Sequence, residues 1–302
     1  MLIKIGTRGS KLALAQTNYV CDALKKSFPE HQFEITVIKT TGDKDLTKPL
    51  DQLGSKGLFV DEIEKALINN DIQLAVHSMK DMPAKPADGL IFAKSWTRED
   101  PRDVLILKSG NKLSDLPQGA NVATGSKRRS YQLLKLRPDL NIFPIRGNID
   151  TRIKKLFSGL EDGTTLDGIV LAAAGLHRLD IGTDNCYYFD TEEMIPAPAQ
   201  GTLGIELKAD DQELMKMVNS LSNEEAESIT FLERGFLDKI GGDCHLPIGA
   251  HAYKESGKFV LKTVFGDENG EKMAFSTVKG TSADTGLIEK AVLDIRRQLE
   301  GG

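Results

Sequence analysis

The chain has 302 residues, 40% of them hydrophobic and 27% charged, with a formal net charge of −5 at pH 7. This length predicts two domains, or three if each is small, and the composition is that of an ordinary globular protein. The negative charge excludes a broad basic surface for nucleic acid, so any anion site must be a local cluster of Arg and Lys.

Membrane, disulfide and metal chemistry are also excluded by the sequence. The first six residues are too short for a signal-peptide core, and no apolar run reaches the length of a membrane span. The three cysteines, Cys21, Cys186 and Cys244, are too scattered for a disulfide framework or a zinc site. We therefore expect a cytoplasmic protein without a metal, a membrane partner or a nucleic-acid partner.

Strand and helix patterns alternate along the first 94 residues. We predict strands at 2–6, 33–39, 74–77 and 90–94. One helix begins near Ser10 as its N-cap and places Cys21 in the core, and another follows Gly54-Ser55-Lys56-Gly57 and carries residues from Leu58 to Leu67. This alternation is typical of an α/β domain with parallel strands.

A charged segment at 96–102 is interpreted as a crossing into a second lobe with the same alternation. Its strands are predicted at 104–107, 121–124, 141–145 and 168–172, with helices around Leu133 and Leu156. The segment 195–201 looks like a return crossing, after which a strand at 203–207 rejoins the first lobe. The expected domains are 1–97 with 199–220, and 102–195, with a hinge at the crossings.

The last 80 residues have a different pattern. Ser222-Asn223-Glu224-Glu225 has the form of a capping box, and the helix it begins would bury residues Ile229 to Ile240. A glycine-led loop with Cys244 follows, then antiparallel strands at 248–253, 259–265 and 273–278 and a final helix. This indicates a small third domain, 222–302, of α+β type.

The stretch from Leu74 to Pro83 is the first candidate site. A short apolar strand ends in His77, Ser78, Lys80 and Asp81, and ligands of open α/β sheets bind at the carboxyl ends of strands. The alternative is that Lys80 and Asp81 form a solvated turn pair. His77 is interpreted as a packed strand-end residue, since no nucleophile pattern surrounds it.

Gly-Ser-Lys occurs at 9–11, 54–56 and 125–127, each time where a helix is predicted to begin. The free N–H groups of a helix start suit phosphates or carboxylates, but Gly-Ser is also ordinary N-cap sequence. None of the three matches a P-loop, and no GxGxxG follows the first strand.

Cations recur at strand ends and helix starts, and one acid lies among them. The cations are Arg8, Lys56, Lys80, Arg128, Arg129, Arg146, Arg152 and Arg178. Gathering them in an acidic protein favours a polyanionic ligand, for which guanidinium forks suit carboxylates. Asp81 suits stabilising a developing cation. The alternative interpretation of any single Arg is a solvated surface residue, and that of a single cysteine such as Cys244 is a small core residue.

The motifs together resemble one family, hydroxymethylbilane synthase, also called porphobilinogen deaminase. They are Thr7-Arg8-Gly9-Ser10, Lys56-Gly57-Leu58-Phe59, His77-Ser78-Met79-Lys80-Asp81, Arg98-Glu99-Asp100-Pro101-Arg102-Asp103, Ser126-Lys127-Arg128-Arg129, Arg146-Gly147-Asn148, residues 171–176, Gln200-Gly201 and Cys244-His245-Leu246-Pro247. The resemblance implies a transferase of tetrapyrrole and heme biosynthesis. It joins four porphobilinogen molecules head to tail with loss of ammonia, and water then releases linear hydroxymethylbilane.

The resemblance also implies a fold, a cofactor and site residues. Two lobes would be built like periplasmic binding proteins, and Cys244 of the third domain would hold a dipyrromethane cofactor through a thioether. Asp81 would be catalytic; Lys80, Arg128, Arg129, Ser126, Thr124 and Ser78 would hold the cofactor; and Arg8, Ser10, Lys56, Arg146, Arg152 and Arg178 would hold the substrate. We expect a monomer. Gln52, Gly125 and Asp243 depart from residues common in the family.

Two alternatives remain at the level of sequence. A non-catalytic anion-binding module of the same bilobal kind would have no use for Asp81 or Cys244. A nucleic-acid binder using 127–129 is disfavoured by the net charge and by the lack of interleaved aromatic residues.

Overall fold

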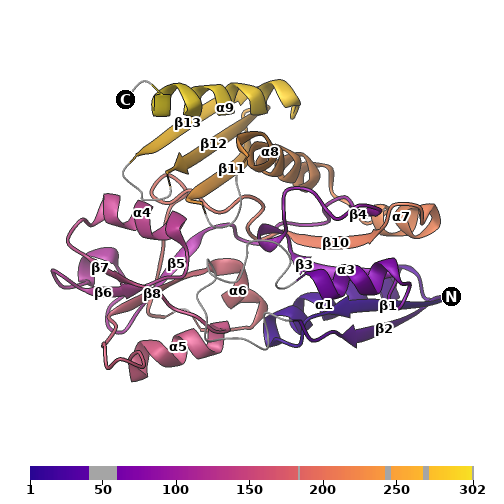
Figure 1. Cartoon of the computed structure of the whole chain (residues 1–302), viewed down its shortest axis with the longest axis horizontal. Helices are drawn as coiled ribbons and strands as arrows, with labels where there is room; N and C mark the ends of the chain where they lie inside the picture. The colour runs from indigo at the N-terminus through magenta and orange to yellow at the C-terminus, as the bar shows by residue number, and fades with distance from the viewer. Residues whose placement is uncertain (41–59, 183, 242–245, 268–271, 301–302) are drawn as a thin grey trace. The chain divides into compact units, whose positions relative to one another are not determined.

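The structure is a computed structural model that describes residues 1–40, 60–182, 184–241, 246–267 and 272–300. The chain divides into two compact units (Figure 1). The first comprises residues 1–99 and 201–231, and the second comprises 100–200 and 232–302. No helix among the described residues is both long and apolar enough to cross a membrane.

The first unit contains a sheet with the strand order β2-β1-β3-β10-β4. Its strands are β1 (Leu2–Thr7), β2 (Gln32–Val37), β3 (Leu74–Ser78), β4 (Leu90–Phe92) and β10 (Leu203–Lys208). β1 pairs in parallel with β2 and β3, whereas β10 is antiparallel to both β3 and β4. All five were predicted, and β10 does rejoin the first lobe.

Helices cover both faces of this sheet. α1 (Lys11–Ser27) and α7 (Gln212–Asn219) pack on one face, where Leu24, Leu74 and Val218 share a core, and α3 (Asp61–Ile68) packs on the other. Ser10 caps α1 as predicted, its Oγ accepting from Ala13 N at 3.2 Å. Cys21 is 1% exposed, which confirms it as a core residue.

The second unit contains a sheet with the order β7-β6-β8-β5-β9. Its strands are β5 (Asp103–Leu107), β6 (Asn121–Ala123), β7 (Asn141–Phe143), β8 (Gly168–Ala172) and β9 (Cys186–Tyr188). A 3-10 helix, η3 (Leu113–Asp115), precedes β6. α4 (Lys127–Leu136) packs on one face, and α5 (Ile149–Ser158) and α6 (Ala173–Arg178) pack on the other.

The two sheets are built on the same plan. In each, four described strands run in one direction and one runs against them, which is β10 in the first unit and β5 in the second. Each reversed strand comes directly after the chain passes from one unit to the other, near Glu99 and near Gln200. The mainly parallel, doubly crossed lobes of the predicted fold class are therefore confirmed.

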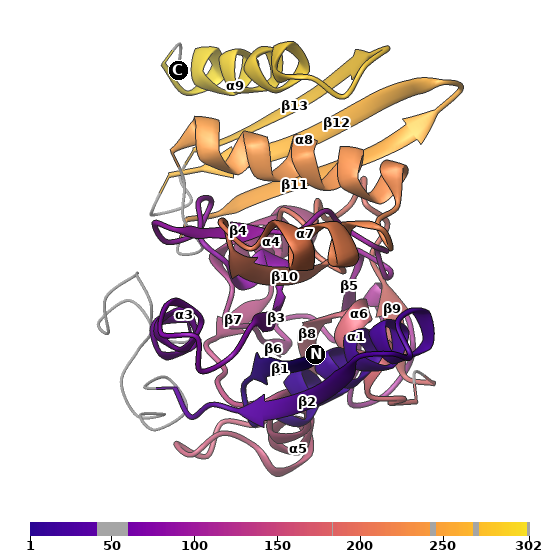
Figure 2. The ribbon, with the colours of Figure 1, turned by 90° about the vertical axis from the view of Figure 1, so that its right-hand side faces the viewer.

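The C-terminal part has the predicted α+β composition. α8 (Glu224–Ile240) is followed by an antiparallel sheet of β11 (Ile248–Glu255), β12 (Lys258–Gly266) and β13 (Met273–Gly280), and α9 (Thr285–Glu300) packs on β12 and β13 (Figure 2). Because this sheet groups with residues 100–200 in the second unit, a boundary near residue 222 stays a prediction. The cap of α8 is Asn223, not Ser222, because Asn223 Oδ1 accepts from Ala226 N at 2.9 Å.

Among the described α-helices and strands, three were missed by the sequence patterns: α6, α7 and β9. α6 has only six residues and follows β8 directly. α7 begins at a clear N-cap, since Asp211 Oδ1 accepts from Leu214 N at 3.0 Å, and its apolar residues do recur at helical spacing. β9 has only three residues and pairs with β5 alone, so it is too short to show a period.

The return crossing needs glycine at position 201. Gly201 has a φ of +92°, and an added Cβ would lie 2.2 Å from the backbone oxygen of Glu99. We expect Gly201→Ala to lower the free energy of unfolding by more than about 1 kcal/mol, since alanine is strained at this φ and the backbone has to move. Urea denaturation measures the loss. Gly89→Ala is the control, because Gly89 has a φ of +83° with no atom within 4 Å of an added Cβ; equal losses would rule out the close approach as the cause.

Candidate functional site

The first unit brings three of the predicted residues to one sheet edge. β1 and β3 are parallel, so Arg8 after β1 and the turn after β3 lie beyond the same ends of the strands. The turn is a 3-10 helix, η2 (Met79–Asp81), which contains Lys80 and Asp81. Arg8 and Lys80 are half-buried, and Asp81 is exposed.

The end of β3 is held from two sides. Ser78 Oγ exchanges hydrogen bonds with the Gln16 amide of α1, at 2.9 Å from Nε2 and 3.2 Å to Oε1. Met79 N donates to Thr202 O at 3.0 Å, just before β10. His77 is buried, as interpreted from the sequence, and its Nε2 lies 3.0 Å from Glu206 Oε2. The turn that carries Asp81 therefore begins at the end of a strand whose position is fixed by these contacts.

The second unit repeats this arrangement with more cations. The parallel strands β6, β7 and β8 end at one edge, and the residues that follow these ends include Thr124, Ser126, Arg146 and Arg178. Ser126 caps α4, with Oγ 3.5 Å from Arg129 N. Asp103 lies at the same edge, because it opens the reversed strand β5 opposite Ala172.

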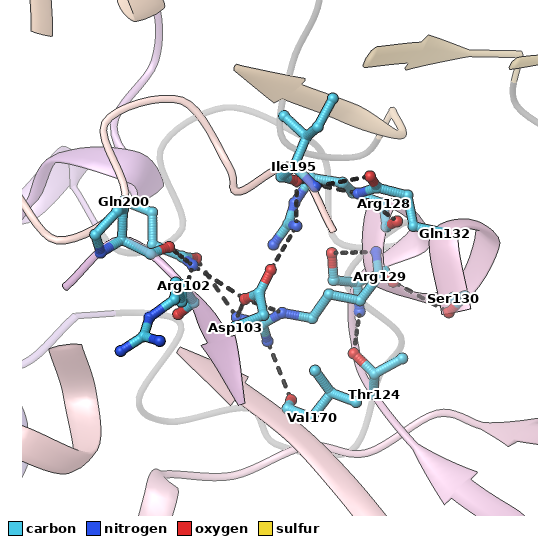
Figure 3. A network of polar contacts seen from close by, with 12 residues as sticks. Arg102, Asp103, Thr124, Arg128, Arg129, Ser130, Gln132, Val170, Ile195 and Gln200 are labelled. Atoms are coloured by element: carbon cyan, nitrogen blue, oxygen red, sulfur yellow. Dashed lines mark hydrogen bonds and ion pairs between the residues drawn. The ribbon is translucent and has the colours of Figure 1, made fainter. Parts of the chain in front are cut away.

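Asp103 joins Arg128 and Arg129 in a buried network (Figure 3). Its carboxylate is 0% exposed; Oδ2 accepts from Arg128 Nη1 at 2.6 Å, and Oδ1 accepts from Arg129 Nε at 2.8 Å and from Gln200 Nε2 at 3.0 Å. Burial alone would raise the pKa of Asp103, but the two guanidinium charges and these bonds hold it well below its usual range. The network is one anion between two cations, so it keeps an excess positive charge.

The two arginines differ in how many donors the protein uses. Arg129 directs Nε and Nη2 to Asp103 and Nη1 to Val170 O at 3.1 Å. Arg128 uses only Nη1, for Asp103 and for Ile195 O at 2.8 Å, and no hydrogen bond joins its Nε or Nη2 to a described residue. Arg128 therefore keeps donors for a ligand carboxylate, whereas Arg129 mainly holds the network.

Arg146 has donor capacity of a different kind. Its Nη2 is buried and has no hydrogen-bond partner among the described residues. A buried guanidinium N–H without an acceptor is costly, so an anionic oxygen at this position would be stabilising. Arg152, on α5, donates from Nε to Gly147 O at 2.7 Å, and Arg178 is the half-buried last residue of α6. The donor set of this edge fits a ligand with several carboxylates.

Several residues named from the sequence lie outside the described residues: the site residues Lys56 and Cys244, the family departures Gln52 and Asp243, and the rest of the motifs at 54–59 and 244–245. Gly125, the remaining departure from the family, is described. An added Cβ there would lie 2.9 Å from Ile145 O, so a side chain at 125 needs a shift of this backbone. No group of three or more His, Cys, Asp or Glu side chains within the described ranges could hold a metal ion.

Sequence reasoning missed the partners of the predicted cations. Asp103, Gln200 and Gln16 hold Arg128, Arg129 and Ser78, but they come from distant parts of the chain. Asp103 and Gln200 stood inside quoted motifs, but the motif that contains Asp103 also contains Glu99 and Asp100, so the sequence did not single out the partner of the two arginines.

The chain matches two family models along most of its length. The model "Porphobilinogen deaminase, dipyromethane cofactor binding domain" matches residues 3–216, and "Porphobilinogen deaminase, C-terminal domain" matches residues 229–300. Among solved structures, the methionine-binding protein MetQ is similar over 73% of this chain and 89% of its own, with a TM-score of 0.45 and 13% identity.

Curated relatives agree with the family models. A porphobilinogen deaminase of Lachnospira eligens is 50% identical over 94% of this chain and 96% of its own length. One of Clostridioides difficile is 47% identical over 100% of both chains. From both domain models and these nearly full-length relatives, the chain belongs to the porphobilinogen deaminase family.

Proposed function

We propose how the residues of this chain carry out the family reaction, in which four porphobilinogen molecules are joined head to tail and hydroxymethylbilane is released. Asp81 is the catalytic carboxylate. It stabilises the positive charge that develops on the pyrrole nitrogen of the substrate while the aminomethyl group leaves as ammonia, and it helps to move protons. Its exposure at a sheet edge supports this role, because a substrate can reach it there.

The cations bind the carboxylates of the pyrroles. Each porphobilinogen carries an acetate and a propionate group, so a growing product needs many guanidinium forks. We assign Arg8, Ser10, Lys56, Arg146, Arg152 and Arg178 to the substrate and Lys80, Arg128, Arg129, Ser126, Thr124 and Ser78 to the cofactor. The buried Nη2 of Arg146 and the unused donors of Arg128 support carboxylate binding by these two residues.

The family model is that of a dipyrromethane-binding domain, and Cys244 would hold this cofactor through its sulfur. When bound, dipyrromethane supplies the primer from which the product grows. The residues around it keep the local charge positive: Asp103 cancels only one of the two charges of Arg128 and Arg129. This excess favours deprotonated carboxylates at the edge of the second sheet.

One observation supports the proposal most strongly. In each unit, residues from separate motifs follow parallel strands that end at the same edge, as expected for a ligand site in an α/β sheet. We further propose a cytoplasmic monomer without nucleic-acid or membrane partners, built from domains 1–97 with 199–220, 102–195 and 222–302.

The intact mass of the purified chain tests the proposed function. The wild type should be heavier than the bare polypeptide by two pyrrole units, and it should turn over porphobilinogen. Cys244→Ser is the matched control and should run at the mass of the bare polypeptide. A wild-type chain of unmodified mass, or a Cys244→Ser chain with full turnover, would contradict the proposal and favour a non-catalytic anion-binding module.

A further inference from the structure

Glu206 is a buried carboxylate in the first unit whose place in the reaction is unassigned. It lies on β10 and is 0% exposed. Its Oε2 lies 3.0 Å from His77 Nε2, and its Oε1 is buried without a hydrogen-bond partner among the described residues. His77 is the side chain that holds this carboxylate.

Burying a carboxylate in this way costs free energy of folding. Taking a charge out of water costs several kcal/mol unless it is paired and fully hydrogen-bonded, and apolar residues of similar size are often as stable or more stable. Glu206 stands between the apolar residues Ile205 and Leu207 of the same strand, both of which are buried. Stability alone therefore does not explain a glutamate at this position, and a positioning role does.

The strand that carries Glu206 also contacts the strand end and the turn that carry Asp81. β10 lies beside β3 (Figure 1), with Gly204 opposite His77. Thr202 O accepts from Met79 N, and an added Cβ on Gly204 would lie 3.3 Å from the Met79 sulfur. Backbone, packing and the His77–Glu206 bond thus all join the end of β3 to residues 202–206.

We propose that Glu206, acting through His77, is a positioning residue that fixes the turn Met79–Asp81 on β10 and so sets the place of the Asp81 carboxylate. Only three residues separate His77 from Asp81: Ser78 ends β3, and Met79 and Lys80 form a single 3-10 turn together with Asp81. A change in the direction of the end of β3 therefore changes the position of Asp81 directly. This inference rests on the role proposed for Asp81.

Neighbouring charges show that Glu206 acts within a cluster. Burial, together with the neighbouring carboxylates of Glu206 and Asp61, raises the pKa of Glu64 on α3, and the nearby His77 opposes this. Glu64 therefore lies close enough to His77 and Glu206 to interact with them electrostatically, but no hydrogen bond joins Glu64 to His77. A substitution of Glu64 provides a control, because it removes a carboxylate from the cluster and leaves the His77–Glu206 bond in place.

A double-mutant cycle on the holoenzyme tests the inference. Glu206→Leu should lower kcat by about 10-fold or more with KM nearly unchanged, because a misplaced catalytic group costs rate. Glu206→Gln, which keeps an acceptor for His77, should recover most of the loss. In an Asp81→Asn background, Glu206→Leu should lower kcat less than about twofold, because residues that act as a unit are not additive. Glu64→Gln should keep the wild-type kcat.

The outcomes separate the two proposals. Full turnover by Asp81→Asn would contradict the role of Asp81. An impaired Asp81→Asn whose loss adds to that of Glu206→Leu would overturn the positioning inference, and so would wild-type kcat in Glu206→Leu or no recovery in Glu206→Gln. If Glu206→Leu does not fold, the same cycle run with His77→Phe, which breaks the bond from the other side, decides by the same criteria.

Discussion

Asp81→Asn is expected to bind porphobilinogen with a nearly unchanged KM and to lose about 10²-fold or more in kcat, as when one electrostatic partner of a transition state is removed. Asparagine keeps the shape and a hydrogen-bonding oxygen of the side chain but removes its charge. The developing cation is then no longer matched, while contacts to the substrate carboxylates persist. Because Asp81 is exposed, the change should leave the free energy of unfolding within about 0.5 kcal/mol, so lost turnover would not reflect unfolding.

Steady-state kinetics on protein with a verified covalent mass measures this effect. Asp88→Asn is the control, since Asp88 is also exposed but lies just before the beginning of β4, whereas Asp81 lies just beyond the end of β3, which runs in the same direction. It should keep the wild-type kcat. Wild-type turnover in Asp81→Asn would reject the catalytic role, and an equal loss in both variants would indicate a general charge effect on the first unit.

Asp103→Asn is expected to lower the free energy of unfolding by about 3–5 kcal/mol, the usual cost of breaking a buried ion pair by removing one partner. The change leaves the guanidinium groups of Arg128 and Arg129, which are 4% and 7% exposed, without a compensating anion. Urea denaturation monitored by circular dichroism measures the loss. The contribution of Asp103 has a defined pH dependence: it is present above the unfolded pKa of about 3.9 and is lost as the pH falls toward the lowered folded pKa.

The matched control for Asp103 lies three residues earlier. Asp100 also pairs with an arginine, since its Oδ2 lies 2.6 Å from Arg102 Nη2, but the Arg102 side chain is 43% exposed. A pair of this kind contributes about 0–1 kcal/mol, so Asp100→Asn should be much milder. If the two variants lose comparable free energies of unfolding, burial does not determine how much the Asp103 network contributes to stability.

The predicted elements and the predicted site differ in how well the sequence specified them. Strands such as β3 and β8 are short apolar runs bounded by polar residues, and helices such as α1 begin at a recognisable cap, so local pattern was enough. The predicted N-cap of α8 was wrong by one residue, because Ser222 and Asn223 are both good N-cap residues and it is Asn223 that makes the capping hydrogen bond. β9 was not predictable, because it is formed only by pairing with β5.

The amino-acid sequence by itself determined the α/β alternation, both crossings and the motifs that identify the family, since these depend on residues near one another in the chain. Only the tertiary structure decided which partners the cations have. Arg128 and Arg129 are held by Asp103, 25 and 26 residues away, and His77 is held by Glu206, 129 residues away. The first two pairs form where α4 packs against the start of β5, and the third forms because β3 and β10 are neighbours in a sheet. No local period or spacing in the sequence records such contacts between distant segments.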